Sequence, residues 1–292
     1  MMVDQDHFLV IEDVYKSYGS KVILDNIDLK VSRSTFCTVV GPSGCGKSTL
    51  LRLILGQEAS DSGKILLDGI PIGFADERRG IVFQKYSLFP HLTVLDNVAL
   101  GLRLNRSAGL TNKEIKTTVM EYLARVRLDQ HSSKYPHELS GGMRQRVAIV
   151  QALIKKPKIL LMDEPFGALD PGTREDLQLF LLEHWEESKM TVFFVTHDLE
   201  EALFLGNRLL VLSQYYQDDR GSHKGHGAKL VADYHLKERA QPTEIKNSPR
   251  FIEFIKRIRE QGFDPDLLQH ARDFNLAHPD SFQTLTVDES RQ

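Results

Sequence analysis

One stretch of the chain has the residue types and the spacing needed to hold the phosphates of a nucleotide. It fits the pattern G-x-x-x-x-G-K-[ST] and consists of Gly41, Pro42, Ser43, Gly44, Cys45, Gly46, Lys47, Ser48 and Thr49. Glycines let the backbone turn its N–H groups toward phosphate oxygens, and the N-terminus of a following helix adds a favourable partial charge. The lysine can reach the β- and γ-phosphates, and the Ser48 hydroxyl can ligate Mg²⁺. The sequence therefore predicts a phosphate loop that binds ATP with Mg²⁺.

Two carboxylates and one histidine each follow an apolar run, which is where ligand-binding side chains lie in parallel sheets. Asp163 and Glu164 follow residues 159–162, and His197 comes after residues 191–195. We expect Asp163 to hold Mg²⁺ through water and Glu164 to orient or deprotonate the attacking water. His197 is expected to hydrogen-bond the γ-phosphate. The alternatives are an acidic pair that caps a helix and a structural histidine.

A second pair of glycines lies outside the phosphate loop and needs a function of its own. Ser140, Gly141 and Gly142 open a predicted helix, with the serine as N-cap and backbone N–H groups left open to an anion. Because one ATP already has its phosphate loop, we expect this surface to contact ATP bound to a second copy of the chain. That arrangement is a homodimer that encloses two ATP molecules. The alternative is a capped helix start without a ligand.

The periodicity of apolar residues predicts the elements that position these side chains. Strands are predicted at residues 8–17, 22–31, 35–40, 64–67, 80–83, 159–162, 191–195 and 209–212. Helices are predicted at residues 48–55, 94–104, 115–126 and 174–187, with another that starts near residue 140. Alternation of strands and helices indicates an α/β fold with a largely parallel, buried sheet. The helices between about residues 94 and 153 form an insert between two parts of this core.

Composition restricts the class of protein. The chain has 292 residues, 41% of them hydrophobic, a formal net charge of −3 and two cysteines. This balance is ordinary for a soluble globular protein and argues against a general polycation for nucleic acid. No apolar run approaches the roughly 20 residues needed to span a bilayer, and the polar N-terminus is unlike a secretory signal. We therefore expect a cytoplasmic protein whose membrane role, if it has one, depends on a partner.

The C-terminal part of the chain has weaker patterns. Residues 217–227 are polar and rich in glycine, and we interpret them as a loop or linker in which His223 and His226 are solvated rather than metal ligands. Residues 251–259 have helical spacing, and residues 278–292 are predicted to be disordered. The segment 216–292 is thus expected to be a partly helical extension of unknown function.

The order of these motifs resembles that of ABC-type ATP-binding cassettes over residues 8–212. The resemblance implies an α/β fold with a P-loop NTPase core of the ABC ATPase type, an antiparallel β subdomain and a helical subdomain at about residues 87–150. The cassette would then span residues 1–215. The resemblance also implies that Tyr18 stacks on adenine and that Gln84 contacts Mg²⁺ and links to the helical insert. Residues 139–142 match the family's signature, and residues 168–170, which include Asp170, match the loop that communicates between the two ATP sites.

The forms of two motifs resemble those of importer cassettes for nitrate, sulfonate or taurine. They are LSGGMRQR, in which Met143 replaces the commoner glutamine, and FPHLTVLDNV. This resemblance implies two transmembrane permease subunits, an extracytoplasmic substrate-binding protein, and a peripheral position on the inner face of the cell membrane. Contact with the permease would involve the segment with Tyr86, Leu88, Phe89, Pro90 and His91, unless these side chains pack in the insert's own core. A urea-like solute or a polyamine also remains open as cargo.

Two other classes of ABC protein compete with the importer. A soluble ATPase acting on nucleic acid or ribosomes would carry long coiled coils or two cassettes, whereas this sequence has one phosphate loop and no sustained heptad run. We therefore expect no nucleic-acid partner. A regulatory cassette without turnover is disfavoured because Lys47, Asp163, Glu164 and His197 are all intact.

Overall fold

The computed structural model describes residues 7–85, 87–104, 109–167, 169–222, 225–236 and 248–284. The chain divides into two compact units. The first contains residues 1–75 and 191–292, and the second contains residues 76–190. Predicted site residues occur in both units, and each unit is therefore described separately.

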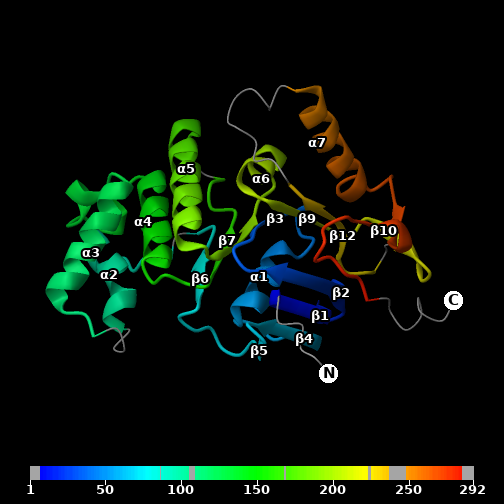
Figure 1. Cartoon of the computed structure of the whole chain (residues 1–292), viewed down its shortest axis with the longest axis horizontal. Helices are drawn as coiled ribbons and strands as arrows, with labels where there is room; N and C mark the ends of the chain where they lie inside the picture. Colours follow the sequence, from blue (N-terminus) through cyan, green and yellow to red (C-terminus); the bar gives the residue numbers. More distant parts are fainter. Residues whose placement is uncertain are drawn as a thin grey trace. The chain divides into compact units, whose positions relative to one another are not determined.

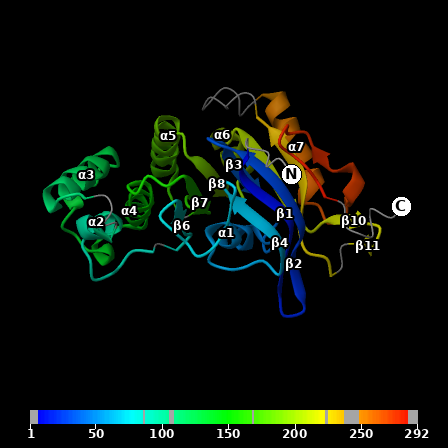
Figure 2. The same ribbon diagram turned by 60° about the horizontal axis from the view of Figure 1, so that its bottom comes forward.

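An antiparallel sheet forms one part of the first unit, and Figure 2 shows its strands side by side. The strands lie in the order β2 (Lys21–Ser32), β1 (His7–Tyr18), β4 (Ser62–Leu67) and β5 (Ile70–Pro71). β1 and β2 form a hairpin in which Tyr18 pairs with Lys21. Apolar residues such as Ile11, Val14 and Ile27 are completely buried, so the alternating pattern in the sequence does indicate half-buried strands.

Mostly parallel strands form the core of the same unit (Figure 1). They lie in the order β14 (Asn275–Leu276), β12 (Lys229–His235), β9 (Arg208–Ser213), β3 (Phe36–Val40) and β8 (Thr191–Val195). β3 pairs in parallel with both β8 and β9, whereas β12 runs antiparallel to β9. Every residue of β3 and β8 is buried, as expected for strands covered on both faces. Helices α1 (Lys47–Leu55) and α6 (Leu199–Leu205) follow these two strands.

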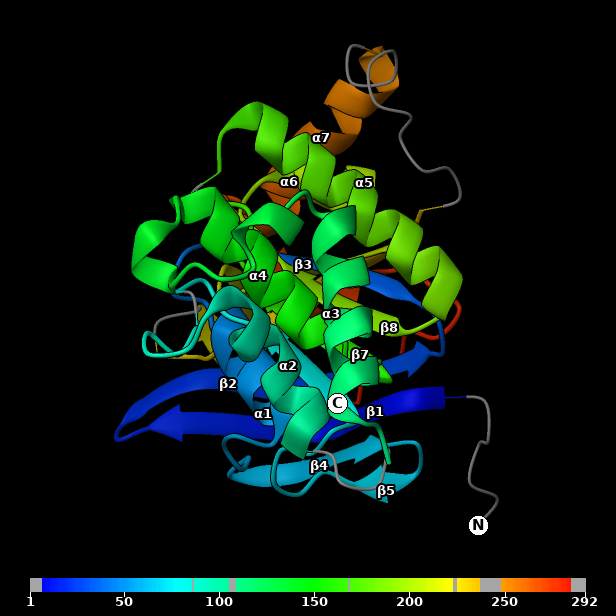
Figure 3. The ribbon, with the colours of Figure 1, turned by 90° about the vertical axis from the view of Figure 1, so that its left-hand side faces the viewer.

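The second unit combines a parallel strand pair with helices. β6 (Arg79–Val82) pairs with β7 (Ile159–Asp163). Between them in the sequence come α2 (Val94–Leu104), α3 (Asn112–Arg125) and α4 (Gly141–Leu153), and α5 (Pro171–Ser188) follows β7. α2, α3 and α4 pack against one another, as Figure 3 shows. A capping box between Thr111 and Glu114 fixes the start of α3.

The structure corrects two expectations for the C-terminal part of the chain. Residues 217–227 are not a solvated loop, because β10 (Tyr216–Asp218) and β11 (Gly221–Ser222) form a hairpin there. Residues 278–284, within the tail that was expected to be disordered, make hydrogen bonds to the core, such as Thr284 N to Asp28 Oδ2 at 2.9 Å. His223 and residues 285–292 lie outside the described residues. The predicted helix is α7 (Pro249–Gly262), and β13 (Gln269–His270) pairs with β10.

Candidate functional site

The predicted phosphate loop connects β3 to α1, and its first glycine is fixed by a close approach. Gly41 has a φ of 154°, and a Cβ atom built on it would lie 1.9 Å from the carbonyl oxygen of Leu212. Gly46 has a φ of 104°, and a Cβ atom there would lie 2.8 Å from both Ile23 Cγ2 and Leu24 Cδ2. No other residue type fits these two positions without a shift of the backbone or of a buried neighbour. The glycines of the motif therefore hold the loop against β9 and β2.

The Lys47 side chain folds back into this loop. Its Nζ donates hydrogen bonds to the carbonyl oxygens of Gly41 and Pro42 at 2.8 Å and 2.9 Å. Residue Lys47 is only 6% exposed. The N-cap of α1 is Gly46, which supplies no side-chain hydrogen bond, and the first turn of the helix contains no acidic residue. A lysine beside an uncapped helix N-terminus is an arrangement suited to an anion.

Cys45 has a structural role in the loop. Its Sγ lies 3.3 Å from the carbonyl oxygen of Leu212, and the side chain is buried. Burial raises the pKa of the Cys45 thiol, so it stays protonated at neutral pH. The thiol therefore anchors the loop to β9 and is not a nucleophile.

The register of the core strands places His197 beside the start of the phosphate loop. Val39 pairs with Val195, and Thr196 N donates to Val39 O at 3.2 Å. Because the strands are parallel, Gly41 and His197 each come two residues after this paired position, just beyond the carboxyl ends of adjacent strands. The His197 side chain is exposed there. The sequence prediction that His197 lies at this edge of the sheet therefore agrees with the register.

Two residues that the sequence did not single out fix the backbone next to His197. The Thr196 hydroxyl donates to Glu201 Oε2 at 2.6 Å and accepts a hydrogen bond from Asp198 N at 3.1 Å. Thr196 is 2% exposed. The Asp198 carboxylate caps α6 through Glu200 N and Glu201 N. The only sequence signal for this arrangement is an N-cap aspartate followed by two glutamates.

Tyr18 lies at the end of β1 and is 43% exposed. Its hydroxyl donates a hydrogen bond to Glu58 Oε2. Glu58 also accepts a hydrogen bond from Arg52 Nη1 of α1 at 3.4 Å. Lys16 Nζ lies 5.5 Å from the centre of the Tyr18 ring. The predicted adenine platform is therefore connected through Glu58 to the helix that follows the phosphate loop.

In the second unit, Gln84 and Glu164 contact each other. Val82 pairs with Met162, so that Gln84 and Glu164 both come two residues after paired positions of parallel strands. Gln84 Nε2 donates to Glu164 Oε2 at 3.2 Å. Glu164 has a φ of 45°, which is unusual for a residue with a Cβ atom and common at functional positions. Asp163 is the last residue of β7 and is partly buried.

The predicted signature forms the start of α4. Ser140 Oγ accepts a hydrogen bond from Met143 N at 3.3 Å, which makes it the N-cap. A Cβ atom on Gly142 would touch Thr173 Cγ2 at 3.4 Å, so α4 approaches the start of α5 closely. Asp170 caps α5 by accepting from Thr173 N at 3.0 Å, and this hydrogen bond lowers the pKa of Asp170. Residues 140–142 and Asp170 thus lie close together, whereas Ala168 lies outside the described residues.

A single buried asparagine shapes the segment that was expected to contact the permease. Asn97 is fully buried and bonds the backbone N and O atoms of Phe89 at 2.8 Å and 3.1 Å. Its Nδ2 also donates to the carbonyl oxygens of Leu92 and Thr93. Phe89 remains 44% exposed, so its ring is not part of the insert's core. Tyr86 lies outside the described residues.

The predicted site residues therefore form two groups, one in each unit. The first unit contains the phosphate loop, Tyr18 and His197, and the second contains the remaining residues, namely Gln84, Asp163, Glu164, Ser140, Gly141, Gly142 and Asp170. Among the described residues there is no cluster of three metal-ligating side chains, and no described helix is long and apolar enough to cross a membrane.

Comparison with known proteins identifies the family. A family model described as ABC transporter matches residues 24–167. The chain is 47% identical over 247 residues to the aliphatic sulfonates import ATP-binding protein of Bacillus cereus, a match that covers 84% of this chain and 90% of that protein. The chain belongs to the ABC transporter family. It is an ATP-binding ATPase of that family, as the order of its motifs predicted.

Two further comparisons support this assignment. The cassette is 43% identical over 249 residues to the taurine import ATP-binding protein of Rhizobium johnstonii, a match that covers 83% of this chain and 90% of that protein. It also resembles a solved dimeric ATP-binding cassette in a post-hydrolysis state with ADP and Pi, with a TM-score of 0.67 and 31% identity. That match covers 79% of this chain and 99% of the solved one. The predicted fold class is thereby confirmed, and the nucleic-acid alternative gains no support from these relatives.

Proposed function

We propose that this cassette is the ATP-hydrolysing subunit of an importer for a small solute that carries a sulfonate or a similar anionic group. The proposal depends mainly on its similarity to the sulfonate import protein, which extends over 90% of that relative. The similarity to a taurine import protein supports the same class of cargo, because taurine is itself a sulfonate. Nitrate, which the sequence motifs also suggested, is a less favoured cargo on this basis.

The roles of the site residues follow from their positions and their chemistry. Lys47 and the loop of residues 41–49, through the backbone N–H groups of its residues other than Pro42, bind the phosphates of ATP, and Tyr18 stacks on adenine. An ammonium group has three donors, and the two carbonyl groups that Lys47 contacts orient it within the loop. Glu164 positions the attacking water or accepts its proton, and His197 contacts the γ-phosphate.

Mg²⁺ fits the chemistry of the residues near the ends of the strands. Ser48 offers a hydroxyl in the first turn of α1, Asp163 offers a carboxylate at the end of β7, and Gln84 offers an amide oxygen. Hard oxygen donors of this kind suit Mg²⁺, and its charge would offset that of the β- and γ-phosphates. These three residues are the proposed ligands, directly or through water.

The cassette is proposed to act as a homodimer. Ser140, Gly141 and Gly142 of one copy would contact ATP held by the phosphate loop of the other, and Asp170 would lie at the same interface. The solved relative described as dimeric supports this arrangement. ATP can shift the dimer from open to closed only because it binds the closed state more tightly. Hydrolysis removes that difference in affinity and lets the dimer reopen.

Closure would drive transport through two transmembrane permease subunits. The proposed contact is the segment around Leu88, Phe89, Pro90 and His91, whose backbone is held by the buried Asn97. An exposed phenylalanine on a fixed loop is well suited to a socket in a partner. The cassette would then lie on the inner face of the cell membrane, and an extracytoplasmic substrate-binding protein would deliver the cargo.

The ATPase part of the proposal is tested by steady-state hydrolysis in the presence of Mg²⁺. Lys47→Ala should abolish hydrolysis and weaken ATP binding, whereas Lys113→Ala on the exposed side of α3 is the matched control and should change neither. Activity of Lys47→Ala equal to that of the unmodified chain would refute the assignment of the phosphate loop.

The transport part is tested by purifying the tagged chain from native membranes in mild detergent. We expect a multi-span membrane protein at equal stoichiometry, and its recovery should fall in the Phe89→Ser variant but not in a Phe74→Ser control. After reconstitution with the binding protein, taurine or an aliphatic sulfonate should stimulate ATP hydrolysis. Recovery of the chain only with ribosomal proteins or nucleic acid would contradict the importer.

A further inference from the structure

The C-terminal part of the chain lines a cavity beside the phosphate loop. The cavity has a volume of about 440 Å³ and is lined by Ser20, Lys21, Val22, Ile23, Gly44, Gln214, Gly225 and His226. A Cβ atom built on Gly44 would meet no atom within 4 Å, so this side of the glycine faces open space. A volume of this order is typical of small-molecule sites. Gly225 and His226 belong to the extension at residues 216–292 and Gln214 lies just before it, and the predicted roles of the cassette use none of these three residues.

The cavity lies between the two parts of the proposed nucleotide site. At one side is Gly44 of the phosphate loop, and at the other is the end of the β1–β2 hairpin with Ser20 and Lys21. Lys21 is paired with Tyr18, the proposed platform for adenine. In ATP the ribose is the group that connects the phosphates to the base. A ligand that placed its phosphates on the loop and its base on Tyr18 would therefore place its ribose in this cavity.

Backbone hydrogen bonds hold the C-terminal segment against β2. Ala228 N donates to Ile23 O at 2.8 Å, and Asp25 N donates to Ala228 O at 2.9 Å. A Cβ atom on Gly227 would lie 2.8 Å from Val22 Cγ1, so glycine allows the close approach. His226 directly precedes Gly227 in the chain. The strand that carries Lys21 and Ile23 therefore also fixes the position of His226.

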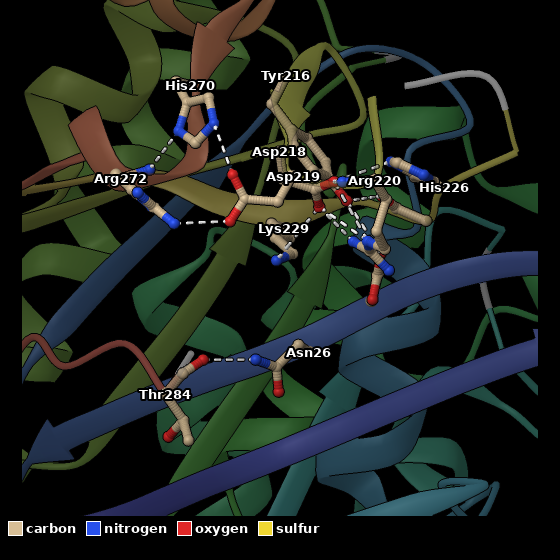
Figure 4. Close-up of polar contacts among 12 residues, drawn as sticks. Asn26, Tyr216, Asp218, Asp219, Arg220, His226, Lys229, His270, Arg272 and Thr284 are labelled. Carbon is tan, nitrogen blue, oxygen red and sulfur yellow. Dashed lines mark hydrogen bonds and ion pairs between the residues drawn. The ribbon is translucent and has the colours of Figure 1, made fainter. Parts of the chain in front are cut away.

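A network of paired charges holds the same segment from the other side, as Figure 4 shows. Arg220 Nη2 donates to Asp25 Oδ2 at 2.7 Å and also contacts the Asp218 carboxylate. Burial alone would raise the pKa of Asp218, but the hydrogen bonds from Arg220 outweigh it and hold the pKa below its usual range. The Tyr216 hydroxyl lies 3.0 Å from both Asp25 Oδ2 and Gly227 O. These contacts keep the hairpin of β10 and β11 attached to β2.

The orientation of His226 leaves part of its ring available to the cavity. Its Nδ1 is buried and lies 3.9 Å from Asp218 Oδ1, and the ring is 6.0 Å from that of Tyr216 between centroids. The side chain is still 14% exposed, so the rest of the ring faces the cavity that it lines. An imidazole can donate or accept a hydrogen bond, and the Gln214 amide can do both. Val22 and Ile23 offer apolar surface to the carbon atoms of a sugar.

We propose that this cavity binds the ribose of the nucleotide and that Gln214 and His226 are specificity-determining residues for its hydroxyl groups. The proposal builds on the proposed function, because it takes the phosphate loop and Tyr18 as the two ends of the nucleotide site. The C-terminal segment is then part of the ATP site of its own chain. Residues that recognise a hydroxyl group select against an analogue that lacks it, because their polar atoms would be left without a partner.

The test compares three probes on the intact chain by isothermal titration: ADP, 2′,3′-dideoxy-ADP and pyrophosphate. The unmodified chain should bind ADP about tenfold more tightly than the dideoxy analogue, since two neutral hydrogen bonds are lost. Gln214→Leu and His226→Ala should each reduce this ratio to roughly threefold, because one hydrogen bond remains. Pyrophosphate has no ribose, and its affinity should stay within about twofold of that of the unmodified chain in both variants.

Control variants and the contrary outcomes distinguish a failure of the ribose proposal from a failure of the proposed function. Gln217→Leu and His235→Ala, which alter exposed residues of β10 and β12 outside the cavity, should keep the tenfold ratio. A ratio near one in the unmodified chain, or an unchanged ratio in both cavity variants, would overturn the inference while leaving the phosphate loop intact. If the unmodified chain bound neither ADP nor pyrophosphate, the proposed function would fail together with the inference.

Discussion

Gln84 donates a hydrogen bond to Glu164 across two parallel strands, with 3.2 Å between Nε2 and Oε2. The two side chains are brought together by register, because each follows a paired residue, Val82 or Met162, by the same number of positions. Glu164 is held by this contact and by a backbone conformation with a φ of 45°. The proposed base is therefore fixed by its own strand and by the strand that leads to the helical insert.

Replacing Glu164 by glutamine should distinguish the effect of its negative charge on turnover from the effect of its position. Glu164→Gln retains an oxygen that can accept the hydrogen bond from Gln84, but it cannot take a proton from water. We expect ATP binding to be kept and turnover to fall by about 100-fold or more, as for loss of a general base. Single-turnover hydrolysis and nucleotide titration measure the two effects, with Glu121→Gln on α3 as an exposed control. Normal turnover would move the catalytic role to another residue.

The two glycines at positions 41 and 44 should respond differently to alanine. Gly41→Ala would force a Cβ atom to within 1.9 Å of the Leu212 carbonyl oxygen, whereas the same atom on Gly44 meets nothing within 4 Å. Gly41→Ala should therefore lower the free energy of unfolding by about 3 kcal/mol through overpacking. Gly44→Ala should cost only about 1 kcal/mol, the strain of its left-handed conformation. Urea unfolding measures both free-energy changes. Equal losses would show that the close approach to Leu212 of β9 does not restrict the residue type at position 41.

Glu58 should position the Tyr18 ring. The Tyr18 hydroxyl bonds Glu58, which also contacts Arg52 of α1. Tyr18→Phe and Glu58→Ala should each weaken ATP binding slightly, and the double variant should be no weaker than the worse single variant. A double-mutant cycle should thus give a coupling equal to the smaller single effect, about 0.5 kcal/mol in ATP affinity. Pyrophosphate affinity should be unchanged throughout, and additive effects on ATP would exclude a positioning role. Tyr18→Ala, which removes the stack, should weaken ATP binding by about 1 kcal/mol.

His184 should make the stability of the second unit depend on pH. The ring lies beside Tyr122 and Phe180, and burial lowers the pKa of His184 below its ordinary value of 6.5. Between the pKa of His184 in the folded chain and its value of 6.5 in the unfolded chain, the unfolded state binds more protons. The stability that neutral His184 contributes is therefore fully present above pH 6.5 and is lost as the pH falls toward the pKa of the folded state. The slope from this residue can reach about 1.4 kcal/mol per pH unit. Urea unfolding monitored by hydrogen exchange in α5 should show this loss, and His184→Phe should flatten it. An unchanged dependence of stability on pH in His184→Phe would show that His184 is not the group responsible.

The buried strands and the phosphate loop could be predicted because their signals are local. All five residues of β3 and of β8 are buried, and their sequences are correspondingly apolar or β-branched. The close contact between Gln84 and Glu164 could not be predicted from spacing, because it depends on the register between strands 80 residues apart. The short helix α6 was missed because its seven residues are too few to show a helical period.

The hairpin of β10 and β11 could not be predicted from the sequence because its charged residues form ion pairs in the fold. Asp218 is almost completely buried, yet it contacts Arg220 and Lys229, and Arg220 also contacts Asp25 of β2. A buried charge that is paired is compatible with a folded strand, whereas the sequence alone shows only a run of polar residues. The order of residues 278–284 could not be predicted either, because their hydrogen-bond partners lie far away in the sequence. Thr284 bonds Asn26 and Asp28, partners more than 250 residues away.

The two residues of β14 close the outer side of the core sheet in the first unit. Asn275 and Leu276 pair with Ala232 and Asp233 of β12, and β14 is the last strand in that order among the described strands. An uncovered strand edge presents backbone donors and acceptors that recruit strands of other molecules. Proteolysis just before residue 275 would therefore leave the backbone N–H and C=O groups on that edge of β12 unpaired. Its first consequence would be self-association into oligomers or fibrils, so this short segment protects the protein's colloidal stability.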